Sequence, residues 1–458
     1  MCLHFFVVDS QITDGLQNHL STPGLSREIL LIDEGCVMLS AKNNKSHARP
    51  VISGIALAVA LLIPALSHAA DKITLRYAIW DRNQLPAEEK IAQSFEKANP
   101  DINIDIEVVP ASQYFVKLDS AVAGGVAPDI FWVNMPYFIQ YAQNHVLAPL
   151  NGYLNDKSVD LNNIVASSVK AYQFDGNQLA IPRDVDAIAV WYNKKLFDQA
   201  GVSYPKKGWT WDDLKTTATA LKAKLKGDAF PLYMDLSNDG QESYLNLLYQ
   251  KGVHIVPTNG QPTDIASDNA IWVYQQLQQM MKGGLLPTAN QMSELKTDSV
   301  FTSNRAAMVY AGSWQAAPFA SNPQINDHIG VIEMPRIDKE AGVAHSLGFA
   351  LYANGKHKDA AWRYVSFMAQ KSSQEELAAA VIPANKQAMP AWAANIKQVD
   401  VTAYLTALDH ATAYPTAGTN TPKWQNMWIS SLKKIFMGAD AKEEMDKSVK
   451  KISRVMEK

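Results

Sequence analysis

The fold is decided by residues 73–109, which read ITLRYAIWDRNQLPAEEKIAQSFEKANPDINIDIEVV. Apolar and polar residues alternate over 73–80 and again over 102–109, and this alternation predicts two strands. Between them, Pro86 followed by acidic residues is typical of a helix start, and the Asn-Pro pair at 99–100 favours its end. The stretch is therefore a strand–helix–strand unit, which predicts two parallel strands joined by a crossover helix.

The same alternation of element types continues along the chain. Residues 114–123 are typical of a helix, and residues 128–133 of a buried strand. Alternating strands and helices predict an α/β fold with mostly parallel sheets flanked by helices. Ligands on such sheets bind beyond the carboxyl ends of the strands, and Trp80, Asp81 and Asn134 follow two of these ends.

Composition restricts the classes of function. The net charge of -3 and the 19% of charged residues fit an ordinary globular protein and argue against binding to nucleic acid or to a membrane surface. All 11 tryptophans lie beyond residue 79. Aromatic residues usually fill cores, but such a content also suits carbohydrate recognition, because flat rings pack against the apolar face of a sugar.

An apolar, uncharged stretch at residues 51–66 follows several basic residues and precedes small ones. This is the pattern of a secretory signal, so we expect a signal peptide at 38–69 that is cleaved near Ala70 and leads to the periplasm. The alternative, a membrane anchor, is disfavoured by the length of the stretch. Residues 1–37 are then expected to be an over-long extension, with translation starting at Met38. The cysteines, Cys2 and Cys36, both precede the signal.

Five segments occur in the order and spacing of one known family. They are FEKANPDINIDIE (95–107), AVAGGVAPDIFWV (121–133), AIAVWYNKKLFDQAGV with WTWDDL (187–202 and 209–214), FTSNRAAMVYAGSW (301–314) and LGFALYANGKHKDAAWRYVSFMAQ (347–370). Together they resemble the family 1 extracellular solute-binding proteins, the maltose-binding-protein-like receptors of ABC importers. One departure is Asn304, where the family often has Gly, but Asn tolerates the left-handed backbone that such a turn needs.

The resemblance implies a two-lobed periplasmic binding protein fold of the type II kind, hinged around a central cleft. The matching segments predict a first lobe of residues 70–186 and 326–372, and a second lobe of residues 190–322 and 376–458. The resemblance also implies a monomer that binds a sugar, oligosaccharide or polyol and delivers it to the permease subunits of an ABC importer in the inner membrane. Neither a cofactor nor catalysis is expected.

Candidate ligand-binding residues follow from the strand ends. Trp80 lies on the face of its strand opposite to the apolar residues, where it could contact a ligand or fill the core, and Asp81 would share its role. Tyr114 opens a helix and could reach the cleft or pack inside. Asn134 could bind ligand or form a turn.

Arg183, Asp184 and Asp186 lie just before the first expected crossing between lobes. Two roles stay open for them: the carboxylates could hold vicinal hydroxyl groups, or an Arg–Asp pair could steady the hinge.

The resemblance adds three more candidates. Trp314 closes the Gly-Ser-Trp motif that places a tryptophan in the cleft in this family, and Trp424 lies where related proteins carry a sugar-stacking aromatic residue. Gly348 belongs to the LGFAL segment, where a glycine lets the backbone approach a ligand.

The sequence contains no G-x-S-x-G, H-E-x-x-H or G-x-x-x-x-G-K motif, and its histidines lack metal-ligand spacing, so no metal site is predicted. Asp184 and Asp186 keep a secreted glycosidase open as an alternative, because two carboxyls are what such an enzyme needs. A receptor for a non-sugar cargo, such as a polyamine or glycerol phosphate, is the other alternative.

Overall fold

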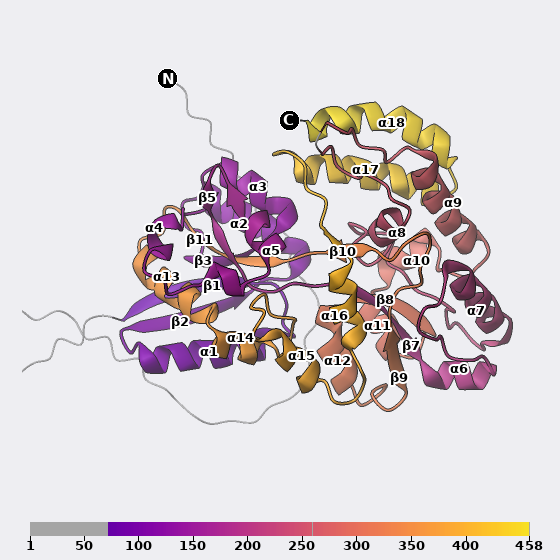
Figure 1. Cartoon of the computed structure of the whole chain (residues 1–458), viewed down its shortest axis with the longest axis horizontal. Coiled ribbons are helices and arrows are strands. Elements are labelled where there is room, and N and C mark those ends of the chain that lie inside the picture. Colours follow the sequence, from indigo (N-terminus) through magenta and orange to yellow (C-terminus); the bar gives the residue numbers. More distant parts are fainter. Residues whose placement is uncertain (1–71, 259, 458) are drawn as a thin grey trace, which may run out of the picture. The chain divides into compact units, whose positions relative to one another are not determined.

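The strand–helix–strand unit predicted at residues 73–109 is present in the structure, a computed structural model that describes residues 72–258 and 260–457. Strands β1 (Ile73–Ile79) and β2 (Ile102–Val108) run parallel along their whole length. Helix α1 (Leu85–Ala98) joins them, with a proline in its first turn, and buries Ile91 and Phe95, which are four residues apart. The unit forms one edge of a larger sheet (Figure 1).

Five strands form the first sheet, in the order β2-β1-β3-β11-β6. Strand β3 (Ile130–Asn134) is parallel to β1, whereas β11 (Leu347–Leu351) is antiparallel to both β3 and β6 (Ala180–Pro182). The predicted parallel arrangement therefore holds for β1, β2 and β3. It fails at β11, because that strand enters the sheet from the opposite end.

Three strands form the second sheet, in the order β8-β7-β9. Strand β7 (Ile188–Asn193) is antiparallel to β8 (Met308–Gly312) and to β9 (Ile329–Ile332). We expected a mostly parallel sheet in the second lobe, and this prediction is wrong for these strands. The long segments that connect them bring the chain back in the opposite direction.

Crossing segments connect the two sheets. Asp184 forms a β-bridge with Pro383, and Asp186 forms one with His345, so three stretches of chain run side by side here. Because β9 pairs in the second sheet, the return to the first sheet falls near residue 345, and the boundary expected at 326 is wrong. The other boundaries of the two lobes stay a prediction.

Helices pack against the first sheet, namely α2 (Ala111–Ala123), α3 (Met135–Gln143) and α13 (Lys358–Met368), whereas α14 (Lys371–Leu377) packs against α1 and α13 (Figure 1). Shorter elements follow them in this part: α4 (Asn151–Leu154), η1 (Leu161–Asn163), α5 (Ala166–Ala171), β4 (Gln173–Phe174) and β5 (Asn177–Gln178).

The second sheet and its surroundings include α6 (Lys194–Ala200), α7 (Trp211–Lys224), α8 (Tyr244–Gln250), α9 (Asp268–Lys282), α10 (Ala289–Glu294), α11 (Thr297–Thr302), η2 (Ser313–Gln315) and α12 (Ala316–Ser321). The C-terminal part contributes α15 (Met389–Asn395), α16 (Thr402–Asp409), α17 (Thr421–Phe436) and α18 (Ala441–Met456). A two-stranded sheet pairs β10 (Gly342–Ala344) with β12 (Ala411–Ala413).

Local sequence signals explain several of these elements. Thr210 and Asp213 form a capping box at the start of α7. Asn304 has a φ of 58°, so it adopts the left-handed backbone expected where the family has Gly. Near the C-terminus α17 and α18 are separate helices, because the chain turns at Gly438, whose φ is 114°.

The predicted signal peptide at 38–69 and the extension at 1–37 lie outside the described residues. Among residues 72–258 and 260–457, none of the helices has the length and apolar character needed to cross a membrane. These residues belong to one compact unit, His68–Lys458.

Candidate functional site

A pocket of about 400 Å³ lies where the two sheets and the crossing segments meet. Its lining comes from the ends of β1 and β3, from both crossing segments and from loops of the second sheet. Six of the ten residues predicted from the sequence line it: Trp80, Asp81, Asn134, Asp184, Asp186 and Trp314.

An aromatic cluster supports Trp80 on the first-sheet wall. Its ring packs edge-on against the rings of Tyr114 and Trp132, with centroid distances of 4.9 and 5.0 Å. Tyr114 itself is buried, and its hydroxyl lies 3.0 Å from the carbonyl oxygens of Ala78 and Trp132. The predicted ligand contact of Tyr114 is therefore not supported: this residue holds Trp80 from behind, which is the packing role left open for it.

Hydrogen bonds orient the polar groups on the same wall. Asp81 accepts from the backbone N–H of Asn83 and from Nε2 of Gln84, both at 2.9 Å. The Oδ1 atom of Asn134 accepts from the backbone N–H of Tyr137 and so caps α3. Asn134 thus combines its turn-forming role with a place in the pocket lining.

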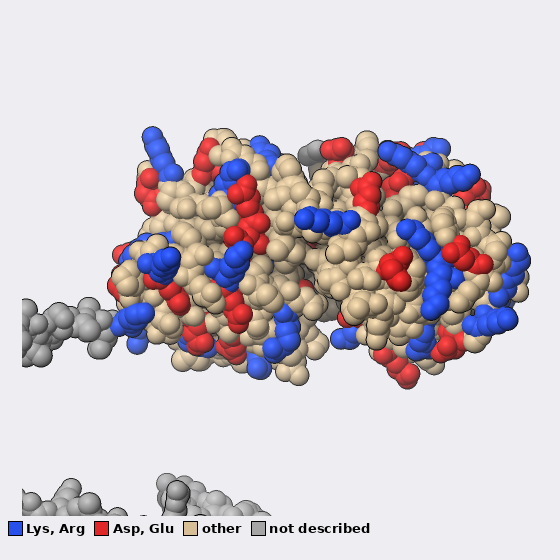
Figure 2. All heavy atoms as spheres, turned by 90° about the horizontal axis from the view of Figure 1, so that it is seen from below, with Lys and Arg blue, Asp and Glu red and all other residues tan. Residues whose placement is uncertain are grey.

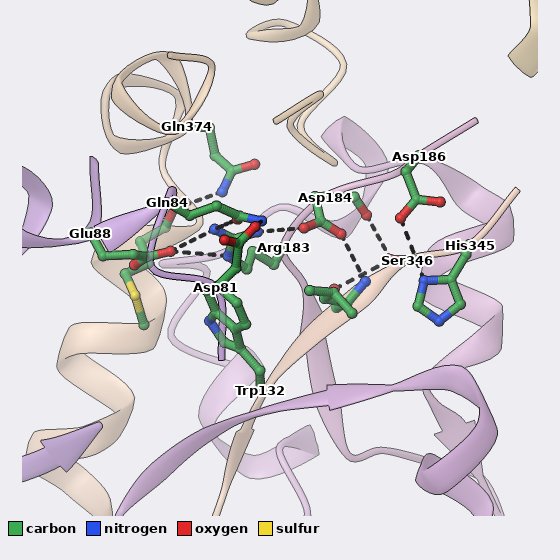
Figure 3. Close-up of polar contacts among 12 residues, drawn as sticks. Asp81, Gln84, Glu88, Trp132, Arg183, Asp184, Asp186, His345, Ser346 and Gln374 are labelled. Atoms are coloured by element: carbon green, nitrogen blue, oxygen red, sulfur yellow. Dashed lines mark hydrogen bonds and ion pairs between the residues drawn. The ribbon is translucent and has the colours of Figure 1, made fainter. Parts of the chain in front are cut away.

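Arg183 lies behind the pocket and is fully buried (Figure 3). Its guanidinium donates to Oε1 of Glu88 from Nε and Nη2, at 3.0 and 2.7 Å, and forms an ion pair with Asp184. It also donates to Oε1 of Gln84 at 2.7 Å and stacks over Trp132 at 4.2 Å. Arg183 does not line the pocket, so the structure gives no support to its predicted ligand contact. The Arg–Asp pair of the second role left open for it is present, and its effect on the hinge stays a prediction.

Both carboxylates that follow Arg183 line the pocket. Asp184 accepts from the backbone N–H of Leu347 at 2.8 Å, and its burial raises its pKa to about 6 despite the nearby arginine. Asp186 accepts from Nε2 of Gln241 at 2.6 Å and lies 3.5 Å from Nδ1 of His345. Burial would lower the pKa of His345, but the neighbouring Asp186 raises it overall.

The second-sheet wall is built mainly by residues that sequence reasoning missed: Asp239, Gln241, Lys296 and Asp298, together with His345 from the crossing. They lie in loops and at a helix start, where no hydrophobic periodicity marks them. Asp239 accepts from the backbone N–H of Gln241 at 3.1 Å and from the hydroxyl of Tyr414 at 3.0 Å. A turn-forming run of small polar residues at 237–240 was the sole local signal.

Trp314 faces the pocket from η2, directly after β8. A Cβ atom at Gly312 would lie 2.1 Å from the Trp314 ring, so a glycine is required for this ring position. The backbone N–H of Gly312 donates to Glu242 at 3.0 Å. Burial, together with the nearby charge of Asp235, raises the pKa of Glu242 to about 8.

Trp424 and Gly348 do not line the pocket. Trp424 is fully buried in α17, and its Nε1 donates to the carbonyl oxygen of Ala417 at 3.2 Å, so its predicted sugar-stacking role is wrong in this structure. At Gly348 an added Cβ would lie 2.9 Å from Ala180 and 3.2 Å from the ring of Tyr172. That glycine is needed for packing within the sheet and not for access to a ligand.

The described part of the chain contains no group of acidic, histidine or cysteine side chains suited to hold a metal ion. The pocket offers two partly exposed indole rings, hydrogen-bond acceptors on five aspartates and one lysine. Such a set can hold a polar solute by stacking and by hydrogen bonds.

Comparisons with known proteins agree with this geometry. Residues 80–375 match the family model described as "Bacterial extracellular solute-binding protein". The multiple sugar-binding protein of Streptococcus mutans is 24% identical over 342 residues, which cover 69% of this chain and 76% of the relative. Two solved structures share the fold: the ABC substrate-binding protein Lmo0181 from Listeria monocytogenes in complex with cycloalternan (24% identity, TM-score 0.76, 84% of this chain and 99% of the other), and UgpB from Mycobacterium tuberculosis in complex with glycerophosphocholine (17% identity, TM-score 0.74, 84% and 98%).

Proposed function

The chain belongs to the family of bacterial extracellular solute-binding proteins, the receptors of ABC transporters, and from this premise we propose that it captures a sugar, oligosaccharide or polyol in the pocket between its two sheets. As a member of a receptor family, it is not an enzyme. This removes the secreted glycosidase that Asp184 and Asp186 had kept open.

The observation that carries the proposal is the placement of two tryptophans on opposite sheets. Trp80 follows β1 of the first sheet, and Trp314 follows β8 of the second, and both line the same pocket with part of their rings exposed. Flat indole faces pack against the C–H groups of a sugar ring, and carboxylates accept hydrogen bonds from its hydroxyls. A sugar-binding relative in the same family supports this choice of cargo.

Binding would work by shifting the balance between open and closed lobes. A solute that touches both walls gains contacts only when the lobes close, and it therefore stabilises the closed state. A shift from about 1% to 99% closed requires about 5.5 kcal/mol of preference for that state. The permease of an inner-membrane importer would then recognise the closed receptor in the periplasm, as a monomer.

A thermal-shift screen of the purified mature protein over sugars, polyols, polyamines and phosphate esters tests the proposal, because a ligand that binds only the folded form raises the melting temperature. A sugar or polyol is expected to raise it, and titration calorimetry then gives the affinity. The double variant Trp80→Ala/Trp314→Ala should lose the shift. Trp272→Ala is the matched control, since Trp272 is also partly exposed but lies on α9, outside the pocket lining.

A shift with glycerol phosphates or polyamines alone would replace the proposed cargo while leaving the receptor role intact; the glycerophosphocholine complex of UgpB makes that outcome the main alternative. A full shift retained by the double variant would contradict the assignment of the pocket.

A further inference from the structure

The pocket lining carries more acidic than basic side chains. On the face shown in Figure 2, acidic and basic side chains are interspersed. In the pocket lining, by contrast, five aspartates face one lysine and one histidine: Asp81, Asp184, Asp186, Asp239 and Asp298 against Lys296 and His345.

Neighbouring cations compensate little of this charge. Arg183 is the buried cation behind the first wall, and it is shared between Asp184 and Glu88, so one positive charge serves two carboxylates. Asp186 and Asp239 are held mainly by neutral donors, namely the amide groups of Gln241 and, for Asp239, the hydroxyl of Tyr414.

Further acidic groups lie nearby. Asp235 and Glu242 belong to the same loop as Asp239, and the charge of Asp235 contributes to the raised pKa values of Asp239 and Glu242. Nδ1 of His345 lies 3.5 Å from a carboxylate oxygen of Asp186. His345 carries a positive charge only when it is protonated.

Closure of the lobes would worsen this imbalance. A ligand that fills the pocket displaces water, and carboxylates that lose water are costly unless they are paired. A neutral sugar supplies hydroxyl donors but no charge, so it would leave the negative charge of the carboxylates without a counter-charge. A ligand with a positive charge would instead pair with them directly.

We propose, on the basis of the function proposed above, that the solute is an aminated one, a sugar or polyol whose protonated amino group lies against Asp186 and Asp239. Ammonium groups are also attracted to the faces of tryptophan rings, and Trp80 and Trp314 line the same pocket. The two features of the pocket, indole faces and carboxylates held mostly by neutral donors, are together those of a site for an organic cation. The amino group makes the aminated solute bind in preference to its hydroxyl analogue, and the indole rings pack against the carbon skeleton of the solute.

Titration calorimetry on matched pairs of compounds tests this inference. Each pair compares amine with hydroxyl: glucosamine with glucose and galactosamine with galactose differ at one position, and chitobiose with cellobiose differs at two. At least one amine is expected to bind ten-fold or more tightly than its hydroxyl partner.

Charge-removing variants sharpen the test. Asp186→Asn and Asp239→Asn should each reduce the preference for the amine to about three-fold or less, while the affinity for its hydroxyl partner changes little. Asp212→Asn, on an exposed site of α7, is the matched control and should keep the preference. Circular dichroism confirms that the variants fold, and the two single variants serve as independent checks on each other.

Each outcome decides between the two proposals. Equal or tighter binding of the hydroxyl compounds overturns the amine while leaving the sugar receptor in place. Binding of the amine that survives in both aspartate variants overturns its placement against Asp186 and Asp239. Absence of binding by every compound of both classes contradicts the inference and the proposed function together.

Discussion

The two walls of the pocket are built differently. On the first-sheet wall, Asp81 and Asp184 connect through Gln84 and Arg183 to one buried network, and Trp80 packs against other rings. On the second-sheet wall, acidic side chains stand on loops with neutral donors, and Trp314 covers a glycine. The first wall is therefore fixed before a ligand arrives, whereas the second is held by weaker contacts that a ligand can rearrange.

The largest expected effect comes from removing the cation of the first wall. Arg183→Met leaves Glu88 and Asp184 buried without their counter-charge. Breaking a buried ion pair by removing one partner costs about 3–5 kcal/mol, so the free energy of unfolding should fall by that amount in urea titrations at pH 7.

Arg76→Met is the control for this change, because Arg76 pairs with Glu107 at an exposed site and should have little effect on stability. A loss at Arg183 no larger than at Arg76 would show that the first wall is not held by its buried network, and the contrast between the walls would disappear.

The two tryptophans compare the walls directly. Trp80→Ala should lower the free energy of unfolding by about 2 kcal/mol, because the ring contacts with Tyr114 and Trp132 are lost. Trp314→Ala should change it by less than about 1 kcal/mol, since no ring partner holds Trp314 among the described residues. Both should weaken ligand binding by about ten-fold or more.

Urea unfolding and calorimetry on the same protein preparations measure the two effects. Equal losses of stability at both positions would mean that the second wall is as firmly packed as the first. A variant that binds ligand as the parent does would exclude its tryptophan from the site.

Much of the first wall was predictable from the sequence, and the second was not. Strand ends are visible in a sequence, so Trp80, Asp81 and Asn134 could be placed at the edge of the first sheet. Asp239 and Asp298 reach the pocket through tertiary arrangement of loops, which leaves no periodic signal.

Burial was the quantity that the sequence could not supply. The pattern around Arg183 and Trp424 suited a ligand-binding role, yet both side chains are fully buried. Whether an aromatic or charged residue faces a core or a cleft depends on elements distant in the chain: Glu88 lies 95 residues from its partner Arg183. Likewise the antiparallel pairing of β7 with β9 depends on a long excursion whose return direction is not encoded locally.

The smallest expected effect concerns the pH dependence of stability on the second wall. In the part of the chain that the structure describes, Glu242 has no ion-pair partner, and its pKa is about 8 in the folded state against an ordinary value of 4.5. Between these values the folded state binds more protons than the unfolded state, so the free energy of unfolding falls as pH rises from about 4.5 to 8.

Glu242→Gln removes this titration and can still accept the hydrogen bond from Gly312. The variant should therefore be more stable than the parent at pH 8, on the order of 1 to 2 kcal/mol after allowance for its partial exposure, and nearly equal to it at pH 4.5. Asp184, whose pKa of about 6 is raised on the other wall, should keep its own contribution between about pH 4 and 6 in both proteins. Urea titrations of both proteins at four pH values separate the contribution of Glu242 from that of Asp184. If the free energies of unfolding of parent and variant change in parallel with pH, the second wall already compensates the charge of its carboxylates. That result would also weaken the case for a cationic ligand.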